Sequence, residues 1–101
     1  MTSEILEIIL SVCCEVFAVK IDEAKSEKTN RKLMRCRNAY SIISREKLDL
    51  SLDEIASPVN KTKGTIHNWI KNQPINDFYY KESLKKCRKK VQDIFNSCSE
   101  D

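Results

Sequence analysis

The residues whose types and spacing best suit chemistry lie between positions 61 and 71, in the run KTKGTIHNWIK. Ile66 and Trp69 have helical spacing, so a helix would turn both toward a core. The polar residues around them include no acid and would face outward; they are Lys61, Thr62, Lys63, Thr65, His67, Asn68 and Lys71. Lysines suit phosphate oxygens, and asparagine and histidine side chains can contact base edges. The pattern favours contact with double-stranded DNA over the alternative, a solvated helix in a structural bundle.

Gly64 interrupts this surface with the only glycine of the chain. A glycine costs about 1 kcal/mol of helix propensity relative to alanine. Such a cost is tolerable where close approach to DNA requires that a side chain be missing.

A short helix is expected ahead of this surface. Ser51 and Glu54 have the spacing of a capping box, which marks a helix start. Pro58 disfavours helical geometry at the residue before it, so we expect the helix to end at Ser57 after roughly two turns.

A tight turn and a second short helix should follow. Asn60 tolerates the left-handed backbone of such a turn, and Thr62 can cap a helix that continues to about Lys71. The small Ala56 lets the two helices cross closely. This spacing predicts a helix-turn-helix centred on residues 51–71.

The rest of the chain predicts helices as well, since apolar residues recur at three-and-four spacing. The expected helices cover residues 3–20, capped by Ser3, then 31–47, capped by Thr29 or Asn30, and 76–98, with a short turn at 22–27. The inward face of the second would be Leu33, Cys36, Tyr40 and Ile43. One Gly and two Pro among 101 residues suit such a fold. We therefore expect a compact all-α domain of about five helices.

The domain organisation follows from these elements. Residues 1–75 should form the helix-turn-helix domain, and residues 76–101 an amphipathic helix that packs on it or mediates dimerisation. The apolar seam of that helix is Leu84, Cys87, Val91, Ile94 and Cys98.

Positive charge recurs in three acid-free sets although the net charge is only +3. The first set is Lys28, Arg31, Lys32, Arg35 and Arg37; the second is Lys61, Lys63 and Lys71; the third is Lys85, Lys86, Arg88, Lys89 and Lys90. Arg31, Lys32 and Arg35 fall largely off the apolar stripe of their helix, free to reach solvent or a phosphate. A polyanion could use all three sets if they share a face.

Three stretches resemble one known family. They are VCCEVFAVKIDEAKS (12–26), RKLMRCRNAYSIISREKLDLSLDEIA (31–56) and KTKGTIHNWIK (61–71). Over roughly residues 5–71 the chain resembles the DNA-binding C-terminal domain of the bacterial replication initiator DnaA. The resemblance implies a Trp-repressor-like fold, in which a basic loop enters the minor groove and a recognition helix enters the adjacent major groove.

The resemblance also implies roles for single residues. Lys28 falls in the basic loop, and Thr65 falls near the start of the recognition helix. Arg31, Arg35 and Arg37 match basic positions that lead into and along the long helix. The family's Arg-Asp-His-Thr-Thr run reads here as Lys61, Thr62, Lys63, Gly64 and Thr65, so we expect a different target sequence or binding mainly through phosphates. No Gly-rich phosphate loop is present, so the initiator's ATPase activity is not implied.

A second class of function remains open: a helical protein-interaction module that reuses the helix-turn-helix fold, for example an adaptor or inhibitor of a replication or transcription factor. The seam and basic flank of residues 76–98 favour it, because a basic flank can bind acidic protein as readily as DNA. Homodimerisation through this helix is also left open; it would predict a two-fold symmetric DNA site.

Catalysis and metal binding are not expected. His67 has no carboxylate or nucleophile at a motif spacing, and the five cysteines form no C-x-x-C pair. We expect no enzyme activity and no cofactor, with reduced, partly buried thiols.

The location follows from the charges near the N-terminus. The apolar run 5–10 is broken by Glu7, so it predicts neither a signal peptide nor a membrane span. We expect a cytoplasmic protein that regulates transcription or replication, bound to the nucleoid or acting in a host cytoplasm. The small size suits a phage or mobile element.

Overall fold

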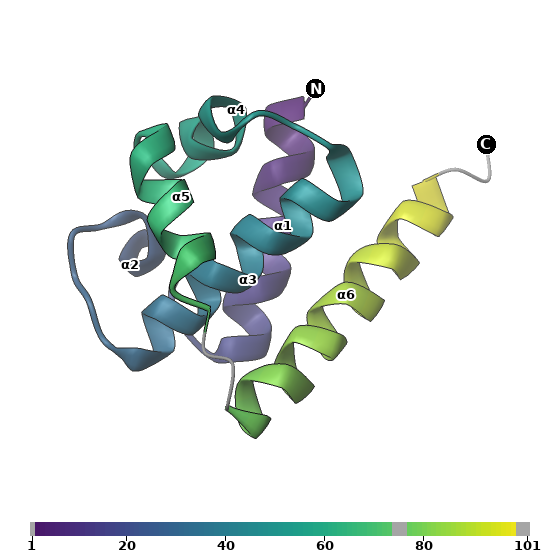
Figure 1. Cartoon of the computed structure of the whole chain (residues 1–101). Coiled ribbons are helices and arrows are strands. Elements are labelled where there is room, and N and C mark those ends of the chain that lie inside the picture. The colour runs from purple at the N-terminus through teal and green to yellow at the C-terminus, as the bar shows by residue number, and fades with distance from the viewer. Residues whose placement is uncertain (1, 74–76, 99–101) are drawn as a thin grey trace.

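The computed structural model describes residues 2–73 and 77–98. Across these residues it contains helices and no strand, so the expected all-α fold is confirmed (Figure 1). The elements are α1 (Thr2–Phe17), α2 (Ile21–Lys25), α3 (Arg31–Leu48), α4 (Leu52–Ala56), the 3-10 turn η1 (Ser57–Val59), α5 (Lys63–Lys71) and α6 (Phe78–Cys98).

Helix α1 begins and ends earlier than the sequence predicts. Its first residue is Thr2, which places the predicted cap Ser3 inside the helix. It ends at Phe17 instead of near residue 20, because Ala18 adopts a left-handed backbone with φ 57°. The Val19 N–H then donates to the Cys14 carbonyl at 3.0 Å, which closes the helix in a Schellman-type ending.

Helix α3 runs through the middle of the molecule (Figure 1) and matches its prediction closely. The Asn30 side chain accepts a hydrogen bond from the Leu33 N–H at 2.9 Å, so Asn30 is the cap. The predicted inward residues are all buried; they are Leu33, Cys36, Tyr40 and Ile43. Asp49 ends the helix in a left-handed conformation.

Helix α4 starts at the predicted capping box, in which the side chains of Ser51 and Glu54 each bind the other's backbone N–H. The prediction of how this helix ends is wrong in one respect. Ser57 keeps a helical backbone, with φ −55° and ψ −51°. Pro58 lies at the start of η1, where a backbone N–H would have no partner within the helix, so proline is tolerated there. The chain then tightens into a 3-10 turn.

The turn into α5 follows the sequence prediction. Asn60 adopts the left-handed conformation, with φ 58°, and Thr62 caps α5 by accepting from the Thr65 N–H at 3.4 Å. Ile66 and Trp69 are buried. Helices α4 and α5 therefore form a helix-turn-helix unit, in the sense of two short helices packed across a tight turn.

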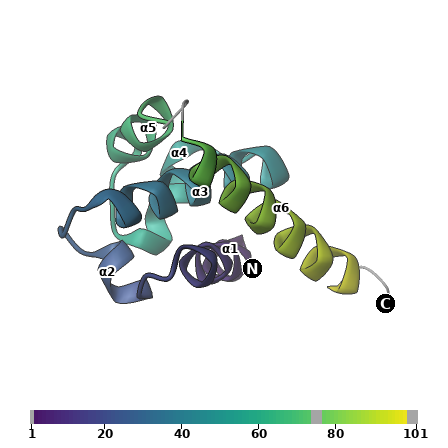
Figure 2. The same cartoon turned by 90° about the horizontal axis from the view of Figure 1, so that it is seen from below.

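Helix α6 packs on α1 and α3 through the first part of its predicted seam. Leu84, Cys87 and Val91 are buried, and Ile94 is half-buried; the predicted start at Asn76 and the side chain of Cys98 lie outside the described residues. Figure 2 shows the C-terminal end of α6 projecting beyond the other helices.

Buried polar side chains of α3 join it to three other helices. The Asn38 amide on α3 donates to the Trp69 carbonyl on α5, and its oxygen accepts from the Tyr80 hydroxyl on α6. The Tyr40 hydroxyl donates to the Ile55 carbonyl on α4 at 2.6 Å. Because every one of these groups is buried, the network fixes how α4, α5 and α6 sit on α3.

The described residues contain neither a membrane-spanning helix nor a cluster of metal ligands. None of their helices is long and apolar enough to cross a bilayer. No three His, Cys, Asp or Glu side chains in the described part of the chain cluster closely enough to hold a metal ion. Four cysteines lie in the core as free thiols, with the Sγ atoms of Cys14 and Cys36 3.7 Å apart.

Candidate nucleic-acid interface

The outer face of α5 is an exposed, acid-free surface. With Ile66 and Trp69 turned inward, the opposite side presents side chains that all lie in solvent. This set, which we call the α5 face, comprises Lys63, Gly64, His67, Asn68 and Lys71. The face is therefore cationic at its ends and carries amide and imidazole groups between them.

The N-terminus of α5 adds polar groups to this face. The hydroxyls of Thr62 and Thr65 lie 3.3 Å apart, and Thr62 is exposed. No acidic residue occupies the first turn of α5, so its partial positive charge is not neutralised there by a side chain of the same turn.

Lys61 does not point freely outward as predicted. Its side chain is only 13% exposed, and its Nζ donates to Glu27 Oε1 at 2.9 Å. Glu27 belongs to the loop between α2 and α3, 34 positions earlier in the chain. The predicted second basic set is thus divided between one paired lysine and two on the α5 face.

Arg37 is inside the molecule, where the sequence predicted a DNA contact. The residue is only 3% exposed. Its guanidinium donates to the carbonyls of Glu23, Ala24, Ser26 and Lys28 at 2.7–3.1 Å. It also lies over the Trp69 ring, 5.5 Å from the centroid. Arg37 therefore organises the α2–α3 loop, and contact with DNA would require those bonds to break.

Arg35 is likewise engaged, contrary to the expectation that it is free to reach a phosphate. Its Nε donates to Asp77 Oδ2 at 2.7 Å, and its guanidinium lies 5.3 Å from the centroid of the Tyr79 ring. Arg31 and Lys32 on the same helix are exposed. Of the first basic set, these two and Lys28 thus remain at the surface.

Lys28 is exposed but paired within its own loop. Its Nζ donates to Glu23 Oε2 at 2.8 Å, and this bond lowers the pKa of the Glu23 carboxyl. Because the Lys28 side chain is largely in solvent, the pair is weak and leaves Lys28 available to another anion.

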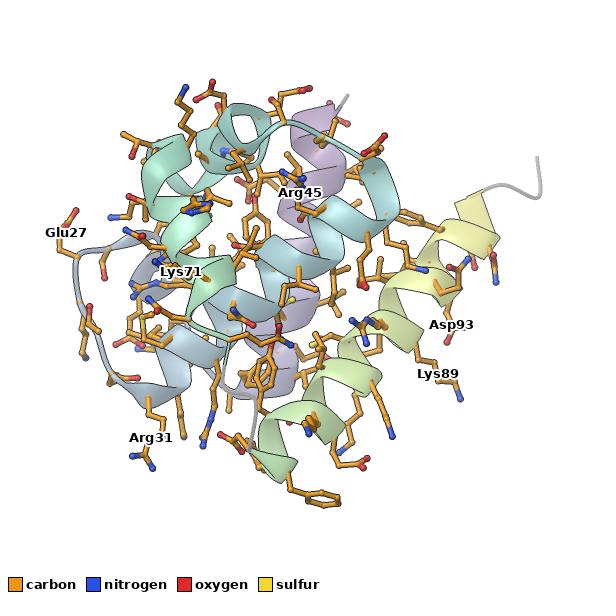
Figure 3. All side chains as sticks on the ribbon, in the orientation of Figure 1. Glu27, Arg31, Arg45, Lys71, Lys89 and Asp93 are labelled. Atoms are coloured by element: carbon orange, nitrogen blue, oxygen red, sulfur yellow. The ribbon has the colours of Figure 1, made fainter. Side chains whose placement is uncertain are left out.

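Members of the third basic set pair with acids of other helices or lie away from α5. Arg88 pairs with Glu46 and Lys90 with Glu15, at 3.0 and 2.9 Å. Figure 3 shows Lys89 on the outer side of α6, across the molecule from Lys71. Lys89 therefore does not share a surface with the α5 face.

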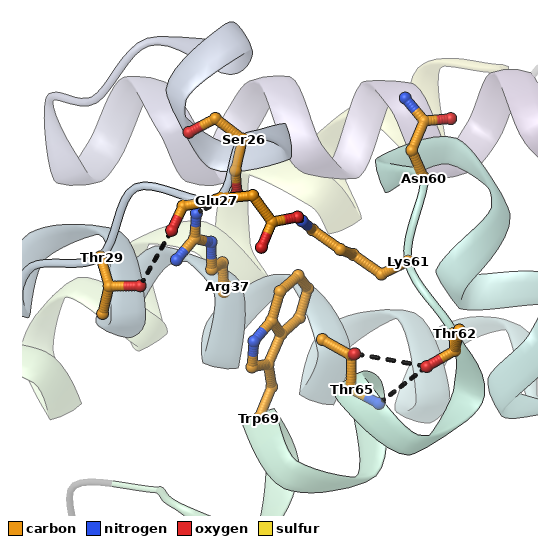
Figure 4. A pocket seen from close by; sticks show the side chains of 9 residues that line it. All are labelled: Ser26, Glu27, Thr29, Arg37, Asn60, Lys61, Thr62, Thr65 and Trp69. Atoms are coloured by element: carbon orange, nitrogen blue, oxygen red, sulfur yellow. Dashed lines mark hydrogen bonds and ion pairs between the residues drawn. The ribbon is translucent and has the colours of Figure 1, made fainter.

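A pocket of about 390 Å³ lies between the α2–α3 loop and the helix-turn-helix (Figure 4). It is lined by Ser26, Glu27, Thr29, Arg37, Asn60, Lys61, Thr62, Thr65 and Trp69. Glu27 and Lys61 reach toward each other above the Trp69 ring. The pairing of Glu27 with Lys61 is not visible in the sequence, because no spacing rule relates residues so far apart in the chain.

Comparison of the chain with protein-family models, curated proteins and solved structures found no match. The geometry of the molecule thus carries the functional argument. Fold and surface together define a small all-α protein with a helix-turn-helix unit, whose second helix bears an acid-free cationic face.

Proposed function

We propose that the protein binds double-stranded DNA with the α5 face in the major groove. The observation that carries this proposal is the exposure of that face, with its lysines at the ends and its amide and imidazole groups in the middle. An α-helix with side chains is about 10–12 Å across, which fits a major groove about 12 Å wide.

The roles of the side chains follow from their chemistry. Lys63 and Lys71 contact phosphates, while Asn68 and His67 contact base edges between them. The Thr62 and Thr65 hydroxyls and the N-terminus of α5 lie where a phosphate is favoured.

The α2–α3 loop flanks α5 and supplies the second contact. Lys28 in this loop and Arg31 and Lys32 at the start of α3 are exposed, and we expect them to meet the DNA backbone next to the groove that α5 occupies. The resemblance to the DnaA C-terminal domain implies the same arrangement, with the loop at the minor groove. The downstream role that we propose is regulation of transcription or replication.

The first test is fluorescence anisotropy with a random-sequence duplex and a pooled duplex library, at low and at physiological salt. Neutralising about four to six phosphates predicts a log–log salt slope close to that number, with negative sign. Lys63→Ala or Lys71→Ala should weaken binding of all sequences alike, about 3- to 10-fold at low salt, and reduce the slope by about one.

Asn68→Ala should instead lower discrimination between sequences, by about tenfold at the base that it contacts. Lys89→Ala is the matched control, because Lys89 is an exposed lysine on the other side of the molecule. Equal losses of affinity for Lys89→Ala and Lys63→Ala would contradict DNA binding through the α5 face. Absence of binding at low salt would contradict it as well.

A second candidate function is that of a protein-interaction module. A groove of about 490 Å³ lies between α1, the end of α3 and the last turns of α6, lined by Ile5, Ile8, Leu48, Gln92, Ile94, Phe95 and Asn96. Ile8 is 39% exposed there and adds apolar surface to the groove. An adaptor, an inhibitor or a homodimer would use this groove, and sedimentation equilibrium separates the dimer from the monomer.

A further inference from the structure

We propose that the pocket beside α5 is a binding site for a DNA backbone phosphate, and that the Glu27 carboxylate occupies its anion position in the free protein. This inference rests on the proposed function and deepens it. It assigns one phosphate contact to Lys61 and an inhibitory role to an acid within the same molecule.

The donors around the pocket suit an anion. Its lining contains the Lys61 ammonium group and the hydroxyls of Thr62 and Thr65. The Arg37 guanidinium also lines it and adds positive charge, but its N–H groups are bound to the loop carbonyls. Glu27 is the only acid among the lining residues, and its Oε1 lies 2.9 Å from Lys61 Nζ. A carboxylate thus already sits where a phosphate oxygen would be bound.

The two partners of this ion pair differ in exposure. The Lys61 side chain is 13% exposed and is held within the pocket, whereas the Glu27 side chain is 98% exposed. Glu27 can therefore turn into solvent at little cost, while Lys61 stays in place. An approaching anion replaces the Glu27 carboxylate and binds the Lys61 ammonium group, which is already in position.

The hydrogen bond and the charge of Lys61 lower the pKa of the Glu27 carboxyl, so Glu27 is a carboxylate at neutral pH. The pair is nevertheless weak in solvent and is screened by salt. A duplex, with its closely spaced phosphates, is a stronger competitor for Lys61 than a single exposed carboxylate.

The position of the pocket agrees with this role. It lies between the two elements proposed to contact DNA, and Thr62 and Thr65 belong both to its lining and to the N-terminus of α5. A phosphate bound here would be the one next to the groove that α5 enters.

The test is a double-mutant cycle on the full chain, measured by anisotropy with a random-sequence duplex at fixed low salt. Glu27→Gln should tighten binding about 3- to 10-fold, since it frees Lys61. Lys61→Gln should weaken binding and reduce the salt slope by about one. In the Lys61→Gln background, Glu27→Gln should have no further effect.

Asp22→Asn is the matched control for charge alone, because Asp22 is an exposed acid on neighbouring α2 and does not line the pocket. It should change affinity less than twofold. Circular dichroism and thermal unfolding check that each variant remains folded.

The contrary outcomes are distinct. If Glu27→Gln tightens binding equally with and without Lys61, or if Asp22→Asn matches it, the effect is one of overall charge and the inference is overturned while DNA binding stands. If the wild-type chain and the α5-face variants all fail to bind at low salt, the proposed function and the inference fall together.

Discussion

At the scale of single residues, Gly64 has no internal reason to be a glycine. A Cβ built at this position would meet only the Thr62 hydroxyl oxygen, at 3.8 Å, which is an ordinary contact. The residue is exposed and helical, so alanine would fit and would favour the helix. The contacts within the chain therefore do not explain the glycine, whereas the proposed close approach of DNA does.

We expect Gly64→Ala to act in opposite directions on folding and on binding. It should stabilise the fold by up to about 1 kcal/mol in urea unfolding, because alanine has the higher helix propensity. It should weaken duplex binding several-fold in the anisotropy measurement, because a methyl group then separates α5 from the groove. Unchanged binding would remove close approach as the explanation.

At the scale of elements, the end of α1 shows a backbone that its residue does not favour. Ala18 is left-handed at the position where helices commonly carry glycine. A left-handed conformation costs a residue with a Cβ roughly 1 kcal/mol or more. The hydrogen bonds from the N–H groups of Ala18 and Val19 hold it there.

We predict that Ala18→Gly stabilises the protein by about 0.5–1 kcal/mol, because glycine adopts this backbone without steric conflict. The measurement is the urea midpoint at a constant m-value. Ser11→Gly is the control, since Ser11 is exposed in the middle of the same helix and glycine there should destabilise by about 0.5 kcal/mol. Destabilisation by both changes would contradict the strain at Ala18.

The elements themselves were largely predictable from local signals. The capping pairs Asn30–Leu33 and Ser51–Glu54 act within one turn, and the apolar spacing of α3 identifies its buried side. The exact ends of α1 were not predictable, because the sequence pattern does not reveal that an alanine becomes left-handed.

The candidate site was predictable only in part, for a physical reason. Periodicity tells which face of a helix is buried, and it correctly placed the α5 face in solvent. It does not tell which charges meet across the fold. Arg35 pairs with Asp77, Arg37 donates to the α2–α3 loop, and Lys61 pairs with Glu27. Each of these contacts forms only when the chain is folded.

At the scale of the whole molecule, Asn38 is the point where α3, α5 and α6 are joined. Its amide nitrogen donates to the Trp69 carbonyl, and its amide oxygen accepts from the Tyr80 hydroxyl. Burial raises the pKa of Tyr80, so this hydroxyl stays protonated. Removing Asn38 would leave two buried polar groups without their partner.

Asn38→Ala should therefore destabilise the protein by about 2–4 kcal/mol. The cost of leaving a buried polar group without a partner exceeds the net free energy that one hydrogen bond contributes. Ser44→Ala on the same helix is the matched control: its buried hydroxyl has no hydrogen-bond partner among the described residues, so its loss should cost less than about 0.5 kcal/mol. Equal losses in urea unfolding would contradict the importance of the network.

The four carbonyl groups held by Arg37 have a consequence for the thermodynamics of recognition. One buried side chain fixes the backbone of the α2–α3 loop at Glu23, Ala24, Ser26 and Lys28 before any partner arrives. A loop that is already ordered loses little conformational entropy on binding. Association through this loop is therefore docking of a pre-organised surface rather than coupled folding, and its heat-capacity change reflects only the area buried.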